Sequence, residues 1–130
     1  MDYSKELGAN LPAGSKQIVL FIPEKDKDGK KIKQSYWVTV ALKSFGFLFR
    51  GATSFPPGKG VWRNDEKGGE LLIEKTIMII SYASPEDLNK KNLENLRSFL
   101  HRMGRESKQG EIGVVIDGTY YGISEYDPAK

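Results

Sequence analysis

The sequence predicts an α+β fold in which two helices cover one face of an antiparallel sheet, and three observations support this prediction. Apolar or β-branched runs at residues 17–23 and 70–83 are typical of strands. Apolar residues recur at helical spacing within residues 35–51 and 84–104. The predicted elements follow the order β-α-β-β-α-β, a ferredoxin-like βαββαβ sandwich, and packing both helices on one face buries their apolar stripes.

The first part of the chain contains the first strand and the first helix. Residues 1–16 show no periodicity and are expected to form an extended N-terminal arm. The run at residues 17–23 closes with a proline, as a buried central strand would. Ser35 is the expected N-cap of the helix and Gly51 its expected end. The apolar face of this helix consists of Val38, Leu42, Phe45 and Phe49.

The middle of the chain predicts a hairpin with an irregular edge. Strand-like residues 52–55 and 61–63 flank a proline- and glycine-rich insert at residues 56–60, which is expected to be a loop because proline cannot donate to a ladder. A polar turn at residues 64–69 leads into residues 70–83, the longest strand candidate.

The second helix is expected to start at Ser84 and Pro85 and to stop at Gly104. Beyond it, Asp117 and Gly118 match a type I′ turn, which predicts an additional C-terminal hairpin strand. The chain therefore divides into the arm, one domain and a tail, at residues 1–16, 17–123 and 124–130.

Composition narrows the class of protein. The 130 residues are 38% hydrophobic and 28% charged, which is typical of one globular domain. The absence of cysteine excludes disulfides, thiolate catalysis and cysteine-type zinc sites. A polar N-terminus and the lack of a long apolar run predict a cytoplasmic protein. The net charge of +3 permits an anionic ligand or nucleic acid without requiring either.

No motif identifies a catalytic residue, a metal site or a cofactor. Asp26 begins a segment that resembles a calcium-binding loop, but position twelve of that loop is Trp37 where a glutamate is needed. Gly58, Lys59 and Gly60 lack the spacing of a nucleotide-binding P-loop. We therefore expect no metal and no cofactor, and leave the catalytic residues unassigned.

Several short segments resemble small uncharacterised bacterial proteins with ferredoxin-like folds. The resemblance spans roughly residues 17–123 and implies the fold, with no activity attached to it. It is carried by Arg50-Gly51-Ala52-Thr53, Gly58-Lys59-Gly60-Val61-Trp62, Glu74, Met103-Gly104-Arg105-Glu106 and Gln109-Gly110-Glu111.

The candidate ligand site is the group of Trp62, Arg63 and Glu74. A hairpin turning at residues 64–69 is expected to bring an aromatic ring, a cation and a carboxylate together beside a glycine-rich loop. The alternative interpretation is structural: Trp62 belongs to the core, and Glu74 forms an ion pair with Arg63 across the hairpin.

A second candidate site is a basic stripe on the second helix, formed by Arg97, His101, Arg102 and Arg105. Residues four apart share a helix face, so these side chains are able to bind an anion. The alternative is an ordinary solvated face with a surface histidine.

Three functions follow from these candidates. The first is a non-catalytic module that binds a small polar or anionic ligand or a protein partner. The second is a nucleic-acid-binding or nucleic-acid-processing subunit, possible but not favoured. The third, ranked last, is a small enzyme that uses the carboxylates of Glu74 and Glu111. The apolar alternation at residues 77–82 and 112–116 leaves one sheet face uncovered, which predicts a homodimer or higher homo-oligomer. No membrane association is expected.

Overall fold

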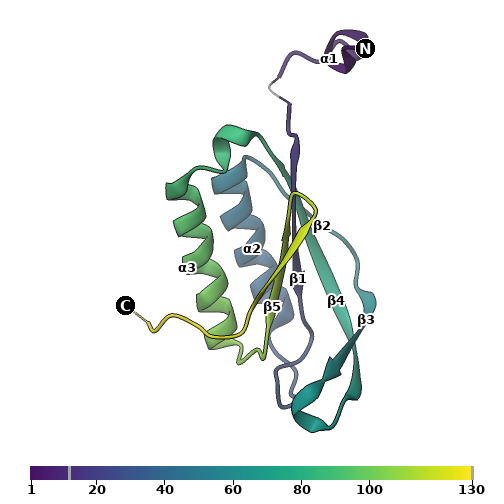
Figure 1. Ribbon diagram of the computed structural model, residues 1–130, viewed down its shortest axis with the longest axis vertical. Helices are drawn as coiled ribbons and strands as arrows, with labels where there is room; N and C mark the ends of the chain where they lie inside the picture. Colours follow the sequence, from purple (N-terminus) through teal and green to yellow (C-terminus); the bar gives the residue numbers. More distant parts are fainter. Residues whose placement is uncertain (12, 130) are drawn as a thin grey trace.

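The computed structural model describes residues 1–11 and 13–129 and has an α+β architecture with a mostly antiparallel sheet of six strands (Figure 1). Two helices lie side by side on one face of the sheet, and a third, short helix stands away from the body (Figure 1). The helices are α1 (Tyr3–Leu7), α2 (Gln34–Phe49) and α3 (Lys90–Glu106). The strands are β1 (Lys16–Ile22), β2 (Thr53–Ser54), β3 (Gly58–Asn64), β4 (Glu70–Ala83), β5 (Ile112–Ile116) and β6 (Thr119–Ile123).

The long strand β4 organises the sheet. The strand order is β2-β4-β1-β5-β6, and β3 also pairs with β4. The second half of β4 pairs with β1, whereas its first half pairs only with β3. The last β1 pair joins Ile22 to Ile77, and the chain then leaves the sheet at Pro23, which has no N–H to donate. The β3–β4 hairpin therefore extends beyond the end of β1.

The core lies between the sheet and helices α2 and α3. Every second residue of β1 points into it, beginning with Ile18 and Leu20, which are fully buried. Phe45 of α2 and Met103 of α3 are the large side chains that cover them. On α2, the predicted apolar face is confirmed at Phe45 and Phe49. Val38 and Leu42 are only partly buried, and the buried positions include Trp37, Ala41 and Leu48 instead.

The helix boundaries differ from the predicted ones. α2 begins one residue before Ser35, and the residue at its N-cap, Lys33, makes no side-chain cap. Pro85–Asp87 forms a separate 3₁₀ turn, and α3 begins after Asn89, whose side chain caps it. The predicted stop at Gly104 is wrong because the helix runs on for two more residues.

The C-terminal hairpin matches its turn sequence. Asp117 and Gly118 have φ angles of 51° and 84°, and a type I′ turn needs a positive φ at both central positions. This turn joins β5 to β6 in the register Ile116 opposite Thr119. The hairpin adds β6 to the edge of the sheet.

The sheet face that points away from the helices carries exposed apolar side chains. Met78 is 37% exposed and Tyr82 is 63% exposed on this face. We expect the purified chain to self-associate, because covering this face removes apolar area from water. Light scattering at micromolar concentration is the measurement; the mass of a single chain, 14.6 kDa, would contradict the prediction.

Candidate functional site

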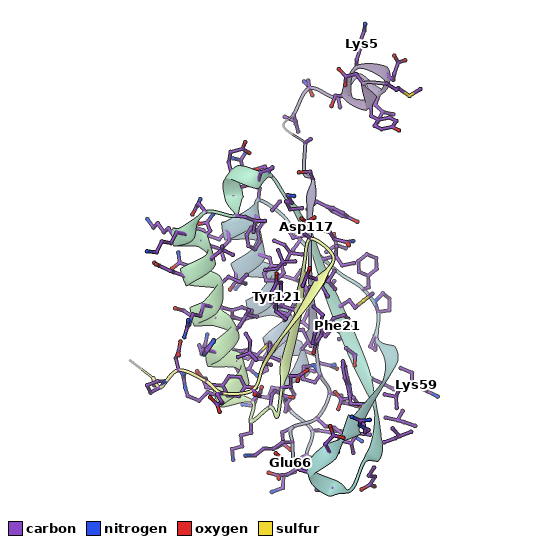
Figure 2. The ribbon with its side chains drawn as sticks, viewed as in Figure 1. Lys5, Phe21, Lys59, Glu66, Asp117 and Tyr121 are labelled. Atoms are coloured by element: carbon purple, nitrogen blue, oxygen red, sulfur yellow. The ribbon has the colours of Figure 1, made fainter. Side chains whose placement is uncertain are left out.

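A cavity of about 300 Å³ opens on the sheet face away from the helices. It lies where β1 ends, between the β3–β4 hairpin and the β5–β6 hairpin. Figure 2 shows Phe21 on the sheet and Glu66 near the tip of the β3–β4 hairpin, and both residues line the cavity. The volume is at the lower end of the range for sites that bind small molecules.

Two walls face each other across this cavity. Trp62 of β3, with Glu74 and Thr76 of the paired strand β4, forms one wall. Glu111 and Tyr120 form part of the other. Trp62, Glu74, Thr76 and Tyr120 alternate along their strands with residues that point elsewhere, so the pleat directs them to the cavity, whereas Glu111 lies just before β5.

The structure brings Trp62, Arg63 and Glu74 to this one cavity, as the candidate ligand site requires. The alternative ion pair between Arg63 and Glu74 is wrong. Register places Glu74 opposite Gly60, and the Arg63 guanidinium is paired with Asp65, with Nε 2.6 Å from Oδ1. Trp62 is 40% exposed and so does not belong to the core.

Burial shapes the electrostatics of Glu74. The half-buried position raises the pKa of its carboxyl above the ordinary value, and the nearby charge of Glu24 raises that pKa further. A backbone N–H of Glu24 and the charge of Lys25 act in the opposite direction. Ionisation of Glu74 therefore opposes folding, as expected for a carboxylate kept for a ligand.

Replacing Glu74 by glutamine is expected to stabilise the fold at neutral pH, because the neutral amide has no charge to desolvate. A carboxyl whose pKa is raised on folding destabilises the native state most above its folded pKa. The advantage of Glu74→Gln should therefore shrink as the pH falls through that pKa. Urea unfolding from pH 4 to pH 8 measures this, and a variant that is less stable at pH 7 would mean that Glu74 has a structural partner.

Glu111 and Tyr120 form a hydrogen-bonded pair on the opposite wall. The Tyr120 hydroxyl donates to the Glu111 carboxylate. Gly113 and Gly122 are cross-strand partners, and a side chain at either position would crowd Tyr120 or Glu111 respectively. Burial and the adjacent carboxylate raise the pKa of Tyr120, so its hydroxyl stays protonated and holds Glu111 in place.

The cavity has an acidic lining in a chain with a net positive charge. Five acidic side chains line it against three basic ones, which are Asp26, Asp65, Glu66, Glu74 and Glu111 against Lys25, Lys27 and Arg63. This excess favours a ligand that carries a positive charge over an anion. Aromatic side chains in the lining also attract cations through their ring faces.

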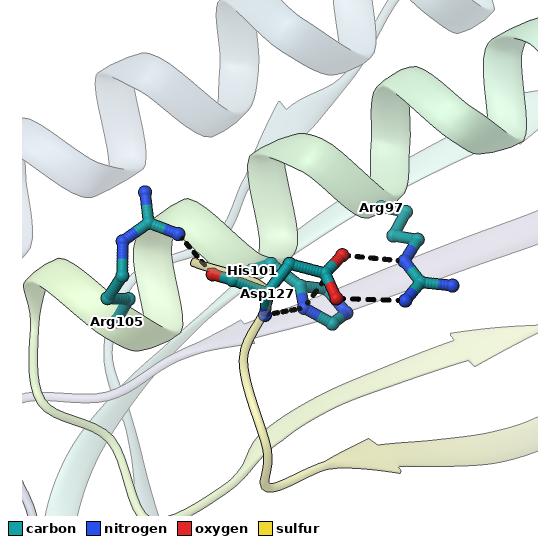
Figure 3. Close-up of polar contacts among 4 residues, drawn as sticks. All are labelled: Arg97, His101, Arg105 and Asp127. Carbon is teal, nitrogen blue, oxygen red and sulfur yellow. Dashed lines mark hydrogen bonds and ion pairs between the residues drawn. The ribbon is translucent and has the colours of Figure 1, made fainter. Parts of the chain in front are cut away.

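The basic stripe of α3 is covered by the C-terminal tail. Figure 3 shows Arg97, His101 and Arg105 converging on Asp127. Arg97 donates two hydrogen bonds to the Asp127 carboxylate, at 2.8 and 2.9 Å, and Arg105 donates one to the Asp127 carbonyl. The Asp127 backbone N–H donates to Nδ1 of His101. The predicted surface histidine is wrong, because His101 is only 8% exposed.

The remaining member of the stripe, Arg102, faces elsewhere. It donates to Glu106 and to the Tyr36 hydroxyl, and its guanidinium lies 5.2 Å from the Trp37 ring centroid. The arginines of the stripe thus make contacts within the chain. Anion binding by this face stays a prediction, and the contacts give each guanidinium an alternative structural role.

Metal-binding clusters and membrane-spanning helices are both absent from the described part of the chain. Residues 1–11 and 13–129 contain no cluster of three histidine or carboxylate side chains placed to hold a metal ion. Within the same ranges, no helix is long and apolar enough to cross a bilayer.

Comparison with known proteins finds solved structures with a similar fold but no related sequence. No family model and no curated protein matches the chain. A phage SAM lyase in complex with S-methyl-5′-thioadenosine superposes with a TM-score of 0.64 at 19% identity, covering 89% of this chain and 94% of that one. A phage SAM lyase in the apo state superposes with a TM-score of 0.58 at 17% identity, covering 92% and 98%.

These likenesses establish the fold and correct the expected function. The leading hypothesis, a non-catalytic binding module, is corrected by this finding, because both matching structures reported above are of phage SAM lyases.

Proposed function

We propose that this chain is an enzyme that cleaves S-adenosylmethionine or a closely related adenosyl sulfonium and releases S-methyl-5′-thioadenosine. The observation that carries the proposal is the likeness to the phage SAM lyases over nearly the whole chain, together with an acidic, aromatic cavity on the sheet. Neither observation would suffice alone, because one fold serves many functions.

The chemistry of the cavity suits such a substrate. An adenosyl sulfonium has a flat base and a permanent positive charge on sulfur. Trp62 offers an exposed indole for stacking, and base–aromatic stacking contributes about 1–3 kcal/mol per base. The carboxylates of Glu74 and Glu111 supply negative charge on the two walls.

The proposed reaction breaks the bond between sulfur and Cγ of the amino-acid chain. Sulfur keeps both electrons and becomes a neutral thioether, and the four-carbon fragment closes on its own carboxylate or loses a proton to a base. Either route consumes no water and no cofactor. Because the substrate's positive charge disappears from sulfur, a partly dehydrated site favours the transition state.

Incubating the purified chain with S-adenosylmethionine tests the proposal. We expect S-methyl-5′-thioadenosine to accumulate faster than in a protein-free incubation, which corrects for spontaneous decay. The NMR spectrum of the four-carbon product distinguishes a lactone from an alkene. A rate equal to that of the protein-free control would overturn the proposed function.

The topology supports one finer description of the fold. Without β6 and with β2 and β3 taken as one interrupted strand, the order of the sheet is that of the ferredoxin-like plan. We propose this description, with the β5–β6 hairpin as the addition at one edge.

A further inference from the structure

A buried hydroxyl in the wall of the cavity has no partner. Thr76 is 8% exposed. Among residues 1–11 and 13–129, its Oγ1 is the one buried side-chain polar atom without a hydrogen-bond partner. A buried hydroxyl left without a partner costs about 1–3 kcal/mol. Native proteins keep such a cost mainly where the group meets water or a ligand.

Gly60 packs closely against this hydroxyl. The position that a side chain of Gly60 would occupy lies 2.8 Å from Thr76 Oγ1 and 3.5 Å from Trp62 Nε1. The lack of a side chain at Gly60 therefore lets two polar atoms of cavity-lining residues converge at one place. Glu74 lies directly across from Gly60 in the strand register, two residues before Thr76 and on the same side of β4. We call this group of Gly60, Trp62, Glu74 and Thr76 the Gly60 notch.

The polar atoms of the Gly60 notch have a definite pattern. Trp62 Nε1 is a donor, a carboxylate at Glu74 is an acceptor, and the Thr76 hydroxyl is both. A cationic group, which only donates, would leave the Trp62 N–H without an acceptor. A pair of neighbouring hydroxyl groups, each able to donate and accept, would satisfy the whole pattern.

We propose that the Gly60 notch binds the ribose hydroxyls of the nucleoside, with Thr76 as a specificity-determining contact and Glu74 as the acceptor. This assignment rests on the proposed function, since it takes an adenosyl compound as the ligand. Acidic side chains bind ribose hydroxyls in the same way in dinucleotide sites. Partial burial of Glu74 strengthens a hydrogen bond to it from a neutral donor.

The arrangement also orients the substrate. With the ribose in the notch, the base reaches the indole ring of Trp62, and the sulfonium end points to the rest of the cavity. The Glu111–Tyr120 pair lies on that opposite wall. The notch therefore binds the uncharged ribose, and the sulfonium lies toward the wall that contains Glu111.

Two substitutions of Thr76 separate this role from a structural one. Thr76→Val replaces the hydroxyl with a methyl group of the same shape, so we expect an unchanged or higher melting temperature. Its affinity for S-methyl-5′-thioadenosine should nevertheless fall about tenfold. Thr76→Ser keeps the hydroxyl and loses a buried methyl group, so it should be less stable and bind almost normally.

Calorimetric titration with S-methyl-5′-thioadenosine and its 2′-deoxy and 3′-deoxy analogues completes the test. In wild-type protein at least one analogue should bind more weakly, and Thr76→Val should show little further loss with that analogue. Normal binding of S-methyl-5′-thioadenosine by Thr76→Val would overturn the notch and leave the proposed function standing. No binding by wild-type protein would instead overturn the proposed function, and the notch with it.

Discussion

Replacing Trp62 by alanine is expected to weaken binding of S-methyl-5′-thioadenosine about 10- to 100-fold while leaving the fold intact. The indole lies in the cavity wall, is 40% exposed, and offers its ring to the adenine base. Loss of base–aromatic stacking by alanine substitution accounts for an effect of that size. Its neighbours on β3 are exposed or only partly buried, so truncation creates no core cavity.

The second tryptophan provides a matched control. Trp37 is 5% exposed, belongs to the core cluster, and makes an edge-on contact with Tyr36. Trp37→Ala should destabilise the protein by about 3–5 kcal/mol. Calorimetric titration and urea unfolding of both variants measure the two effects. Equal binding by wild-type protein and Trp62→Ala would remove Trp62 from the site.

The sequence contained enough information to locate this cavity's first wall. Trp62 and Glu74 stood out because each interrupts a pattern: an indole beside a glycine-rich loop, and a charge within an apolar strand. The predicted turn at residues 64–69 joined the right strands. The turn alone did not fix the register of the two strands. In the structure, Glu74 lies opposite Gly60 and not beside Arg63. A shift of a few residues is enough to exchange one cross-strand partner for another.

Glu111 was named as a candidate carboxylate, but its pairing with Tyr120 and the contacts of the tail were beyond the sequence patterns for a different reason. Tyr120 and Glu111 meet because two glycines, Gly113 and Gly122, lie side by side, and that pairing is a property of the folded hairpin. The polar tail likewise gave no periodic signal, although Asp127 meets Arg97 across thirty residues of chain. Contacts of this kind depend on tertiary structure, so helix-face reasoning offered only an anion-binding site or a solvated face for the stripe.

The expected layers, two helices on one face of an antiparallel sheet, are present in the structure. Alternating and helical periodicities identify which faces are apolar, and these faces dictate that two helices pack on one side of a sheet. The helix boundaries were predicted less accurately, because several neighbouring residues are able to cap a helix. Asn89 and its side-chain cap start α3 later than Ser84 and Pro85 suggested. No sequence motif indicated the chemistry that we propose for the cavity.

Replacing Gly104 by alanine is expected to destabilise the protein by about 1–3 kcal/mol, although alanine is the better helix former. A side chain at this buried position of α3 would overlap the ring of Tyr126. That ring is held in place because the Tyr126 hydroxyl donates to the carbonyl oxygens of Gln109 and Ile123. The overlap would push the tail off the helix and break the contacts of Asp127.

Gly46 gives the opposite expectation and serves as the control. It lies inside α2, and nothing stands within 4 Å of the position that its side chain would occupy. Gly46→Ala should therefore stabilise the protein by about 0.5–1 kcal/mol through helix propensity alone. Tyr126→Ala, added to Gly104→Ala, should relieve the overlap and recover part of the loss. Urea unfolding of the four proteins measures these differences, and a Gly104→Ala variant as stable as Gly46→Ala would show that the tail does not clasp the helix.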